Sequence, residues 1–305
     1  STASDFEEEE NRRGISLSTT VIPIEHKDHK INFLDTPGYT DFVGEVISAM
    51  RVADSAVVVV DSVAGAEVGT EIAWTYADEF NLPRFVVINK MDRDNADFQK
   101  ALGTVATIAE TRLIPVQLPW GEKEEFKGVL DLLSMQAYAG EGKSGEEIPA
   151  EFSDAVEEAR MELVEAAAEG DDELLMKYLD GEELTSDEIM SGLKSAIHNG
   201  EIVPVFVSAA TSEIGMFPML DALIALMPSP AERPAVEAEG AKGTEELPAS
   251  DAGPLAAYVW KTTADPFVGK ITYFKIYSGV INSDDRVWNR SEERRVGKEC
   301  RSRWS

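Results

Sequence analysis

Residues 84–92 have the sequence Arg-Phe-Val-Val-Ile-Asn-Lys-Met-Asp, an apolar run that ends abruptly in polar side chains. A short continuous run of aromatic and β-branched residues is typical of a strand that is buried on both faces of a sheet. Three further runs of this kind occur at 31–34, 56–60 and 202–207, and each also ends in a polar cluster. The pattern predicts several buried strands with polar groups at their carboxyl ends.

Helical patterns, for example at 41–52 and 69–80, separate these runs. Strands that alternate with helices predict an α/β fold, with a doubly wound, mostly parallel sheet and helices on both of its faces. Ligands bind such sheets at the carboxyl ends of the strands, which is where the four polar clusters are expected.

More than a hundred residues separate the runs at 84–88 and 202–207, which is too long for one crossover. We therefore expect an inserted α/β subdomain at about 115–200. It includes a predicted helix at 153–168 with an acidic exposed face. A second helix is expected to begin after Thr185, because Thr185 and Glu188 match a capping box.

The pattern changes after a predicted helix at 219–227. Residues 229–253 are rich in Pro, Ala, Glu and Gly and are predicted to be a linker. Residues 254–288 contain two predicted strands but are too short to close a barrel of ordinary strands. We therefore expect them to be the beginning of a β-barrel domain.

Composition limits the classes of function. The chain has 28 Lys and Arg against 57 Asp and Glu, a net charge of −29. This excludes binding to DNA or to an anionic membrane that is driven by net charge. A single cysteine excludes a disulfide framework, and no apolar run reaches the roughly 20 residues that span a bilayer. We expect a soluble, monomeric, cytoplasmic protein.

Residues 289–305 differ from the rest of the chain. They contain six basic and three acidic residues and the only cysteine, Cys300. A basic arm that contacts rRNA is one interpretation. Because this tail interrupts the β domain and matches nothing before it in composition, we interpret it as non-native.

Asn89, Lys90 and Asp92 offer the groups that recognise a guanine base. The carboxylate of Asp92 can accept hydrogen bonds from the ring N1–H and the N2 amino group, which adenine does not present side by side. Asn89 can bridge the ring N7 and the neighbouring loops, and the Lys90 stem can lie along the face of the base. Taken alone, the motif is also compatible with a polar turn that caps a strand.

Other polar clusters offer groups for phosphate and metal. Asp35 follows a predicted strand and can hold Mg²⁺ through water, and Gly38 allows a backbone N–H to approach a terminal phosphate. Ser16 offers a hydroxyl further upstream. Ser208 and Ala209 are small residues whose backbone N–H groups can reach the carbonyl oxygen of guanine. Each of these is an ordinary turn or loop residue when it is taken alone.

Together, the order of these motifs and their places at strand ends resemble the G domain of the translational GTPases, above all elongation factor G and its elongation-factor-G-like paralogues. The resemblance extends from about 6 to 277 and includes the long insertion and the segment 254–262. It implies a P-loop GTPase-type G domain at 1–228, with GTP and Mg²⁺ as cofactors. It also implies the ribosome as partner, with the inserted subdomain meeting stalk proteins of the large subunit.

The resemblance assigns a role to each candidate residue. Metal binding falls to Ser16 and Asp35, γ-phosphate sensing to Gly38, and guanine recognition to Asn89, Lys90, Asp92, Ser208 and Ala209.

The phosphate-binding loop of this family, Gly-x-x-x-x-Gly-Lys-Ser/Thr, does not occur in the 305 residues. We expect it, with its strand, to precede Ser1. Without this loop the backbone nest and the lysine that hold the phosphates are absent. We therefore expect these 305 residues alone to bind GTP weakly or not at all and to be inactive.

Tyr39 stands where the translocating members of the family carry the histidine that orients the attacking water. Its ordinary pKa near 10 makes it a poor base, although its hydroxyl can place a water. The alternative is that Tyr39 only packs. Tyr39 favours a slower or differently triggered GTPase in translation. A ribosome recycling or protection factor and a GTP-gated binding protein with negligible turnover remain alternatives.

Overall fold

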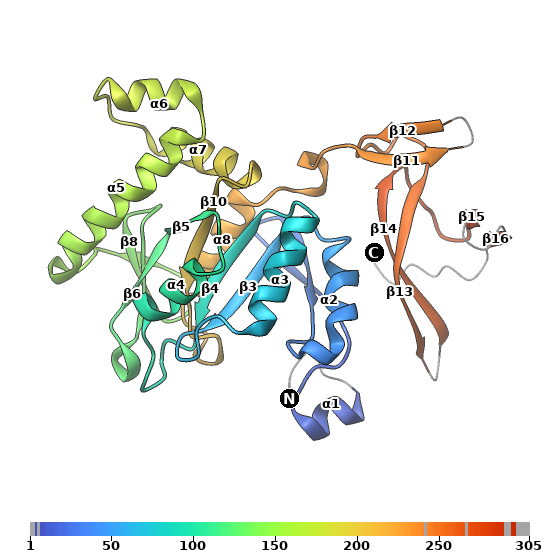
Figure 1. The fold of residues 1–305 in the computed structure, drawn as a ribbon, viewed down its shortest axis with the longest axis horizontal. Coiled ribbons are helices and arrows are strands. Elements are labelled where there is room, and N and C mark those ends of the chain that lie inside the picture. Colours follow the sequence, from blue (N-terminus) through green and yellow to red (C-terminus); the bar gives the residue numbers. More distant parts are fainter. Residues whose placement is uncertain (1–3, 5–6, 241–242, 266–267, 290–293, 297–305) are drawn as a thin grey trace. The chain divides into compact units, whose positions relative to one another are not determined.

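The computed structural model describes residue 4 and residues 7–240, 243–265, 268–289 and 294–296. The chain divides into two units, Ser1–Pro228 and Ser229–Ser305, which are described separately below. Figure 1 shows the elements of both units in the colours of the sequence.

A parallel sheet forms the centre of the first unit. It consists of β3 (Ala56–Asp61), β4 (Arg84–Asn89), β10 (Ile202–Val207) and β5 (Arg112–Pro115), in that order. Every neighbouring pair is parallel. This confirms the predicted α/β fold class, and three of the four predicted apolar runs are strands of this sheet.

Helices cover both faces of this sheet (Figure 1). Successive side chains of a strand point to opposite faces. Phe85 and Phe206 on one face pack against helices α5, α7 and α8, and their ring centroids are 4.5 Å apart. Val86 and Val205 on the other face pack with α3 and α4. These helices are α3 (Val68–Glu79), α4 (Phe98–Ala106), α5 (Ser153–Glu169), α7 (Ser186–His198) and α8 (Met216–Leu226).

The run at 31–34 corrects the prediction. It belongs to β2 (His29–Asp35), which pairs antiparallel with β1 (Thr20–His26) in a separate two-stranded sheet. Lys30 and Asn32 are exposed whereas Ile31 and Phe33 are half-buried. This alternation is the mark of a strand with one solvated face, not of a strand buried on both faces. The polar cluster that follows β2 therefore does not end a strand of the parallel sheet.

The inserted subdomain combines an antiparallel sheet with three helices. The sheet has the order β6-β7-β8-β9, formed by Gln117–Trp120, Gly128–Asp131, Gln136–Ala139 and Gly145–Glu146. Helix α6 (Asp172–Leu179) lies between α5 and α7 in the chain. The predicted capping box is confirmed, because Thr185 and Glu188 hydrogen-bond each other's backbone N–H groups at the start of α7.

The other elements of the first unit are short. They are α1 (Glu8–Arg13), α2 (Val43–Met50), and the 3₁₀ turns η1 (Thr40–Phe42), η2 (Lys123–Glu125), η3 (Ala150–Phe152) and η4 (Ala210–Ser212). Within the described part of the chain, no helix has both the length and the apolar character needed to cross a membrane.

The described strands of the second unit form three antiparallel pairs. A 3₁₀ turn, η5 (Pro230–Glu232), precedes β11 (Val236–Gly240) and β12 (Gly243–Leu247). This hairpin lies in the segment that we predicted, from its composition, to be a linker. Residues 236–240 pair with residues 243–247 as antiparallel strands. The predicted strands of the β domain are β13 (Ala256–Asp265) and β14 (Gly269–Ser278). Closure into a barrel stays a prediction.

The third pair is formed by β15 (Val287–Asn289) and β16 (Arg294–Val296). Most of the segment 289–305, which we interpret as non-native, lies outside the described residues.

Candidate functional site

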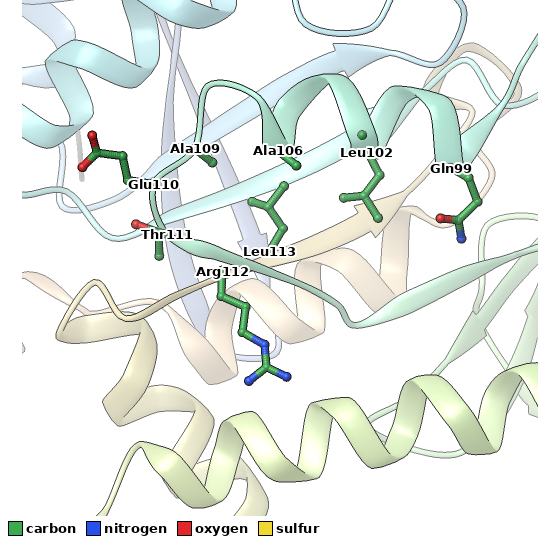
Figure 2. A pocket seen from close by; sticks show the side chains of 9 residues that line it. Gln99, Leu102, Ala106, Ala109, Glu110, Thr111, Arg112 and Leu113 are labelled. Atoms are coloured by element: carbon green, nitrogen blue, oxygen red, sulfur yellow. The ribbon is translucent and has the colours of Figure 1, made fainter.

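A groove of about 510 Å³ lies between α4 and the β5 edge of the parallel sheet (Figure 2). Leu102, Ala106 and Leu113 form much of its apolar lining, and Arg112 lies at its rim. The guanidinium of Arg112 binds the carboxylate of Glu169 on α5 at 3.1 Å, which ties β5 to that helix. None of the predicted site residues lines this groove.

Three strand ends of the parallel sheet lie side by side. Asp61 at the end of β3 is in register with Asn89 at the end of β4. Val207, the last residue of β10, is in register with Ile88. The polar residues after β3, β4 and β10 therefore meet at one edge, as predicted for three of the four clusters.

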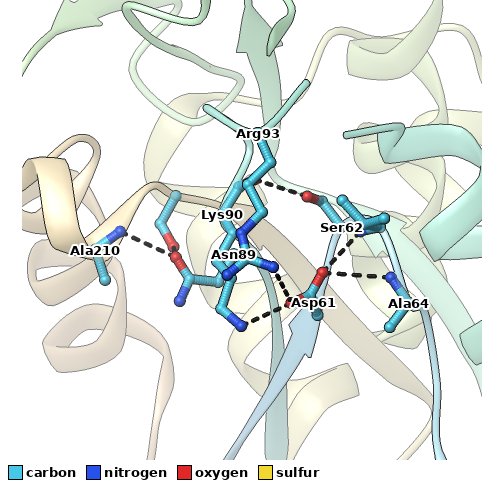
Figure 3. Close-up of polar contacts among 9 residues, drawn as sticks. Asp61, Ser62, Ala64, Asn89, Lys90, Arg93 and Ala210 are labelled. Atoms are coloured by element: carbon cyan, nitrogen blue, oxygen red, sulfur yellow. Dashed lines mark hydrogen bonds and ion pairs between the residues drawn. The ribbon is translucent and has the colours of Figure 1, made fainter. Parts of the chain in front are cut away.

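Asn89 joins the loop after β4 to the loop after β10. Its side-chain oxygen Oδ1 accepts hydrogen bonds from Ser208 Oγ at 3.1 Å and from the Ala210 backbone N–H at 2.9 Å (Figure 3). Among the described residues, no partner of the Asn89 Nδ2 amino group is found. That amino group is the part of the side chain that can donate to an acceptor such as a purine N7.

Asp92, like Asn89, joins the loop after β4 to the loop after β10. Its carboxylate oxygen Oδ2 accepts a hydrogen bond of 2.6 Å from the hydroxyl of Ser212 in η4. The residue as a whole is half-buried. Because a carboxylate has about four acceptor positions, it retains capacity for the two adjacent donors of a guanine edge.

Lys90 has an unusual backbone and two contacts to the end of β3. Its φ of 63° lies in the left-handed region, which a residue with a β-carbon rarely adopts. Its carbonyl oxygen accepts a hydrogen bond of 2.8 Å from Ser62 Oγ, and its ammonium binds Asp61 Oδ2 at 2.6 Å (Figure 3). Both ends of the residue are thus tied to β3.

Asp61 is held by backbone groups as well as by cations. Its Oδ1 accepts hydrogen bonds from the N–H groups of Val63 and Ala64, at 2.9 and 3.3 Å. Arg93 Nη1 lies 3.5 Å from Oδ2. Burial raises the pKa of Asp61, but the hydrogen bonds from Lys90, Val63 and Ala64 outweigh it and lower the pKa to about 2. Asp61 is therefore an anion at neutral pH.

The backbone N–H groups of Ser208 and Ala209, which we predicted can reach a base oxygen, have partners within the protein in this structure. Ser208 N–H donates to the Ile88 carbonyl at 2.9 Å, and Ala209 N–H donates to the Ile214 carbonyl at 3.2 Å. Both residues are only 1% exposed. Buried backbone donors are almost always paired within the protein, so these two N–H groups are not available to a base oxygen in this conformation.

The residues predicted for phosphate and metal lie elsewhere in the first unit. Asp35 is the last residue of β2, and its carboxylate is half-buried. The carbonyl of Gly38 lies against the first turn of α3, 3.2 Å from where a β-carbon on Gly69 would stand. Tyr39 precedes η1 and is 57% exposed, so packing in a core is not its role.

Ser16 lies in the segment between α1 and β1 and is half-buried. The neighbouring carboxylate of Glu10, only 1% exposed, accepts hydrogen bonds from the backbone N–H groups of Leu17 and Ser18. This buried carboxylate gives the segment a defined fold, which its acidic, polar sequence did not predict.

The described residues contain no group of three or more His, Cys, Asp or Glu side chains placed to hold a metal ion. Nor do they show a hydrogen bond or ion pair between the side chains of Asp35 or Tyr39 and the cluster around Asn89. The structure therefore brings together the residues predicted for the base and leaves those predicted for phosphate and Mg²⁺ as a separate set.

The contacts of Asp61, Ser62 and Ser212 were not predicted, although Asp61 and Ser62 do form the polar end of an apolar run. Their position directly after the apolar run 56–60 was the feature of the sequence that could have identified them. Their contacts with Lys90 and Asp92 span 28 to 120 residues of the chain, beyond the reach of a local pattern.

Comparison with known proteins agrees with this geometry. Residues 1–229 match the family model described as the elongation factor Tu GTP binding domain. A crystal structure of a protein from Thermus thermophilus is similar to this chain, with a TM-score of 0.84 and 32% sequence identity. The similarity covers 97% of this chain and 42% of that protein, so the chain spans less than half of its relative. With a parallel sheet whose strand ends carry the Asn89–Asp92 loop, and with a family match across the whole first unit, the chain belongs to the family of the elongation factor Tu GTP binding domain.

Proposed function

We propose that this chain contains much of the GTP-binding domain of a ribosome-dependent GTPase of the elongation factor G type. Such a protein hydrolyses GTP to GDP to drive a conformational step in translation. One observation carries the proposal: the loop of Asn89 and Asp92 is fastened to the loop of Ser208 and Ser212 by three hydrogen bonds of 2.6 to 3.1 Å. The two loops form a rigid edge with guanine-compatible chemistry.

Guanine presents two donors, N1–H and the N2 amino group, on one edge. The carboxylate of Asp92 is oriented by Ser212 and accepts such a pair. Charge-assisted hydrogen bonds of this kind are about twice as strong as neutral ones. Adenine offers an acceptor at N1 instead, which the carboxylate repels, so the same group both attracts guanine and excludes adenine.

The phosphate side of the proposal rests on Ser16, Asp35 and Gly38. A hydroxyl and a carboxylate suit Mg²⁺, which binds one or two protein oxygens and takes its other ligands from phosphates and water. Mg²⁺ would neutralise the charge that develops on the phosphates, while Gly38 offers a backbone N–H to the terminal phosphate.

Tyr39 supports a slower or differently triggered GTPase. Its side chain is exposed, so its hydroxyl is accessible to a water molecule near the phosphate end. It cannot serve as a charged imidazolium would. The same residue favours a second candidate, a GTP-gated binding protein with negligible turnover. A recycling or protection factor would use this G domain in the same way and differ elsewhere in the protein.

The proposed partner is the ribosome, and the inserted subdomain is the proposed contact with stalk proteins of the large subunit. Helix α5 carries the acidic face predicted for this contact. Arg112 lies within 4 Å of three of its carboxylates, those of Glu162, Glu165 and Glu169. The exposed Glu157 and Glu158 therefore remain the carboxylates best placed to meet a partner.

Base selectivity tests the proposal directly. The full-length product of the intact gene should bind GDP at least tenfold more tightly than ADP, as expected from the loss of about 1.5 kcal/mol or more per hydrogen bond to a charged group. Asp92→Asn should reverse the preference toward xanthosine diphosphate, because an amide can donate to the C2 oxygen of xanthine. Equal affinity of the wild-type protein for GDP and ADP would refute the proposed function.

Single-turnover hydrolysis separates the candidate functions. The lead proposal expects ribosomes to accelerate GTP hydrolysis by the full-length protein, whereas the binding protein would show no acceleration. Tyr39→Phe should slow the stimulated rate by roughly tenfold, the effect of losing one hydrogen bond to the attacking water. An unchanged rate would rule out a role for the hydroxyl.

A further inference from the structure

The contacts of Lys90 with the end of β3 suggest a role for a residue outside the predicted motif. Lys90 projects from the loop after β4 toward β3, and its ammonium is fixed on Asp61 Oδ2 at 2.6 Å (Figure 3). The Lys90 side chain is 42% exposed and the Asp61 side chain 17%. The aliphatic stem of Lys90 is thus partly exposed. It is held at one end by the hydrogen bond of its carbonyl with Ser62 and at the other by the ion pair of its ammonium with Asp61.

Asp61 is itself a rigid anchor. One carboxylate oxygen accepts the N–H groups of Val63 and Ala64, which leaves the other oxygen directed at Lys90 and Arg93. The main-chain carbonyl of Asp61 accepts a hydrogen bond of 2.8 Å from Gly65 N–H. The carboxylate therefore does not need to reorient when it holds the ammonium.

Free lysine side chains have many rotamers, and ordering one of them on binding opposes affinity. A lysine that is already held in place avoids most of this cost. In the proposed base site the Lys90 stem forms one wall, beside the edge that Asn89 and Asp92 recognise.

We propose that Asp61 is a positioning residue of the base site: it holds the Lys90 side chain in the geometry in which its stem supports the face of the base. This inference rests on the proposed function. Asp61 does not touch the base, and it acts through Lys90 alone. The low pKa of Asp61 is consistent with this role, because the anchor stays charged throughout the physiological range.

A double-mutant cycle in the full-length protein tests the inference. Asp61→Asn should weaken GDP binding by roughly five- to tenfold, the effect expected for ordering one rotamer-rich side chain. Lys90→Met keeps an apolar stem but removes the ammonium. In the Lys90→Met background, Asp61→Asn should therefore change the affinity by less than about twofold, because interacting residues are non-additive.

Two further variants complete the design. Asp61→Glu keeps the charge and should recover part of the lost affinity. Asp78→Asn is the matched control, since it removes the 2.5 Å ion pair between Asp78 and Arg84 at the opposite end of β4. It should leave GDP affinity unchanged.

The outcomes distinguish the inference from the proposed function. Asp61→Asn could lower GDP affinity equally in the wild-type and the Lys90→Met backgrounds. That result would show that Asp61 acts through the general fold, and it would overturn the inference. The same holds if Asp61→Asn has no effect while the wild-type protein still prefers GDP to ADP. Absence of that preference in the wild-type protein refutes the proposed function itself.

Discussion

At the scale of single residues, the site depends on which oxygen of each side chain is already in use. The side-chain oxygen of Asn89 accepts hydrogen bonds from the loop after β10, so its amino group is the part that can donate to a ligand. Asp92 and Ser212 form a similar pair. The residue types of the motif predicted this chemistry, because amide and carboxylate groups have fixed donor and acceptor sets.

The sequence did not reveal contacts that are set by neighbours in space. The N–H groups of Ser208 and Ala209 were predicted to face a ligand, but carbonyls of Ile88 and Ile214 accept them. Asp61 received no role from the sequence, since its partner Lys90 is 29 residues away. The contacts of Ser208 with Ile88 and of Lys90 with Asp61 depend on the register between strands, which a local pattern does not contain.

The ion pair of Asp61 predicts a pH-dependent contribution to stability. The pKa of Asp61 is lowered from 3.8 to about 2 on folding, so the contribution is present above about pH 4 and is lost as the pH falls toward 2. Asp61→Asn should lower the free energy of unfolding at pH 7 by on the order of 1 kcal/mol, after allowing for solvent screening. Urea denaturation of both proteins between pH 7 and pH 2.5 measures the difference. A difference that stays constant over this range would contradict the assignment.

At the scale of elements, the strands with continuous apolar runs and the helix with a capping box were the most predictable. β4 and β10 are buried, as predicted, whereas β3 at the edge of the sheet leaves Val59 59% exposed and so corrects the prediction of burial on both faces. Helix α7 begins where Thr185 and Glu188 indicated. The placement of β2 was wrong because the short run at 31–34 was treated as continuous, although polar residues alternate around it. The β11–β12 hairpin was missed because its composition resembles that of a linker.

A hairpin turn of the inserted subdomain contacts the loop after β10. Between β8 and β9, the carbonyls of Gly140 and Glu141 accept the N–H groups of Gly215 and Phe217 at 2.9 and 3.0 Å. Gly215 and Phe217 lie at the start of α8, directly after the loop that contains Ser212. The turn therefore fixes the far end of that loop, and we expect its geometry to be sensitive to substitution.

Two glycines in this turn provide a matched pair. Gly140 and Gly142 both have positive φ, but a β-carbon on Gly140 meets open space whereas one on Gly142 collides with the ring of Pro218. Gly140→Ala should cost roughly 1 to 2 kcal/mol of stability from backbone strain. Gly142→Ala should cost about 1 to 3 kcal/mol more, because of overpacking. Urea unfolding of the two variants tests this order, and equal losses would contradict the role of Pro218.

At the scale of the whole molecule, the two units differ in how much apolar surface they bury. All three clusters of buried apolar residues lie within the first unit. In the described part of the second unit, the buried apolar side chains reduce to Leu247. The acidic excess of the chain adds no cohesion, since a net charge of −29 opposes compaction by self-repulsion. The packed layers around the parallel sheet therefore supply most of the stability.

This asymmetry predicts how each unit behaves alone. Residues 1–228 should unfold cooperatively in urea by circular dichroism, because the three clusters of buried apolar residues found in the described chain all lie within that range. Residues 229–305 should show no cooperative transition, since isolated two-stranded pairs are marginally stable in water. The control is the 305-residue chain, whose main transition should coincide with that of residues 1–228. A cooperative transition of residues 229–305 alone would contradict the argument, because it would require a core that the described strands of that unit do not form.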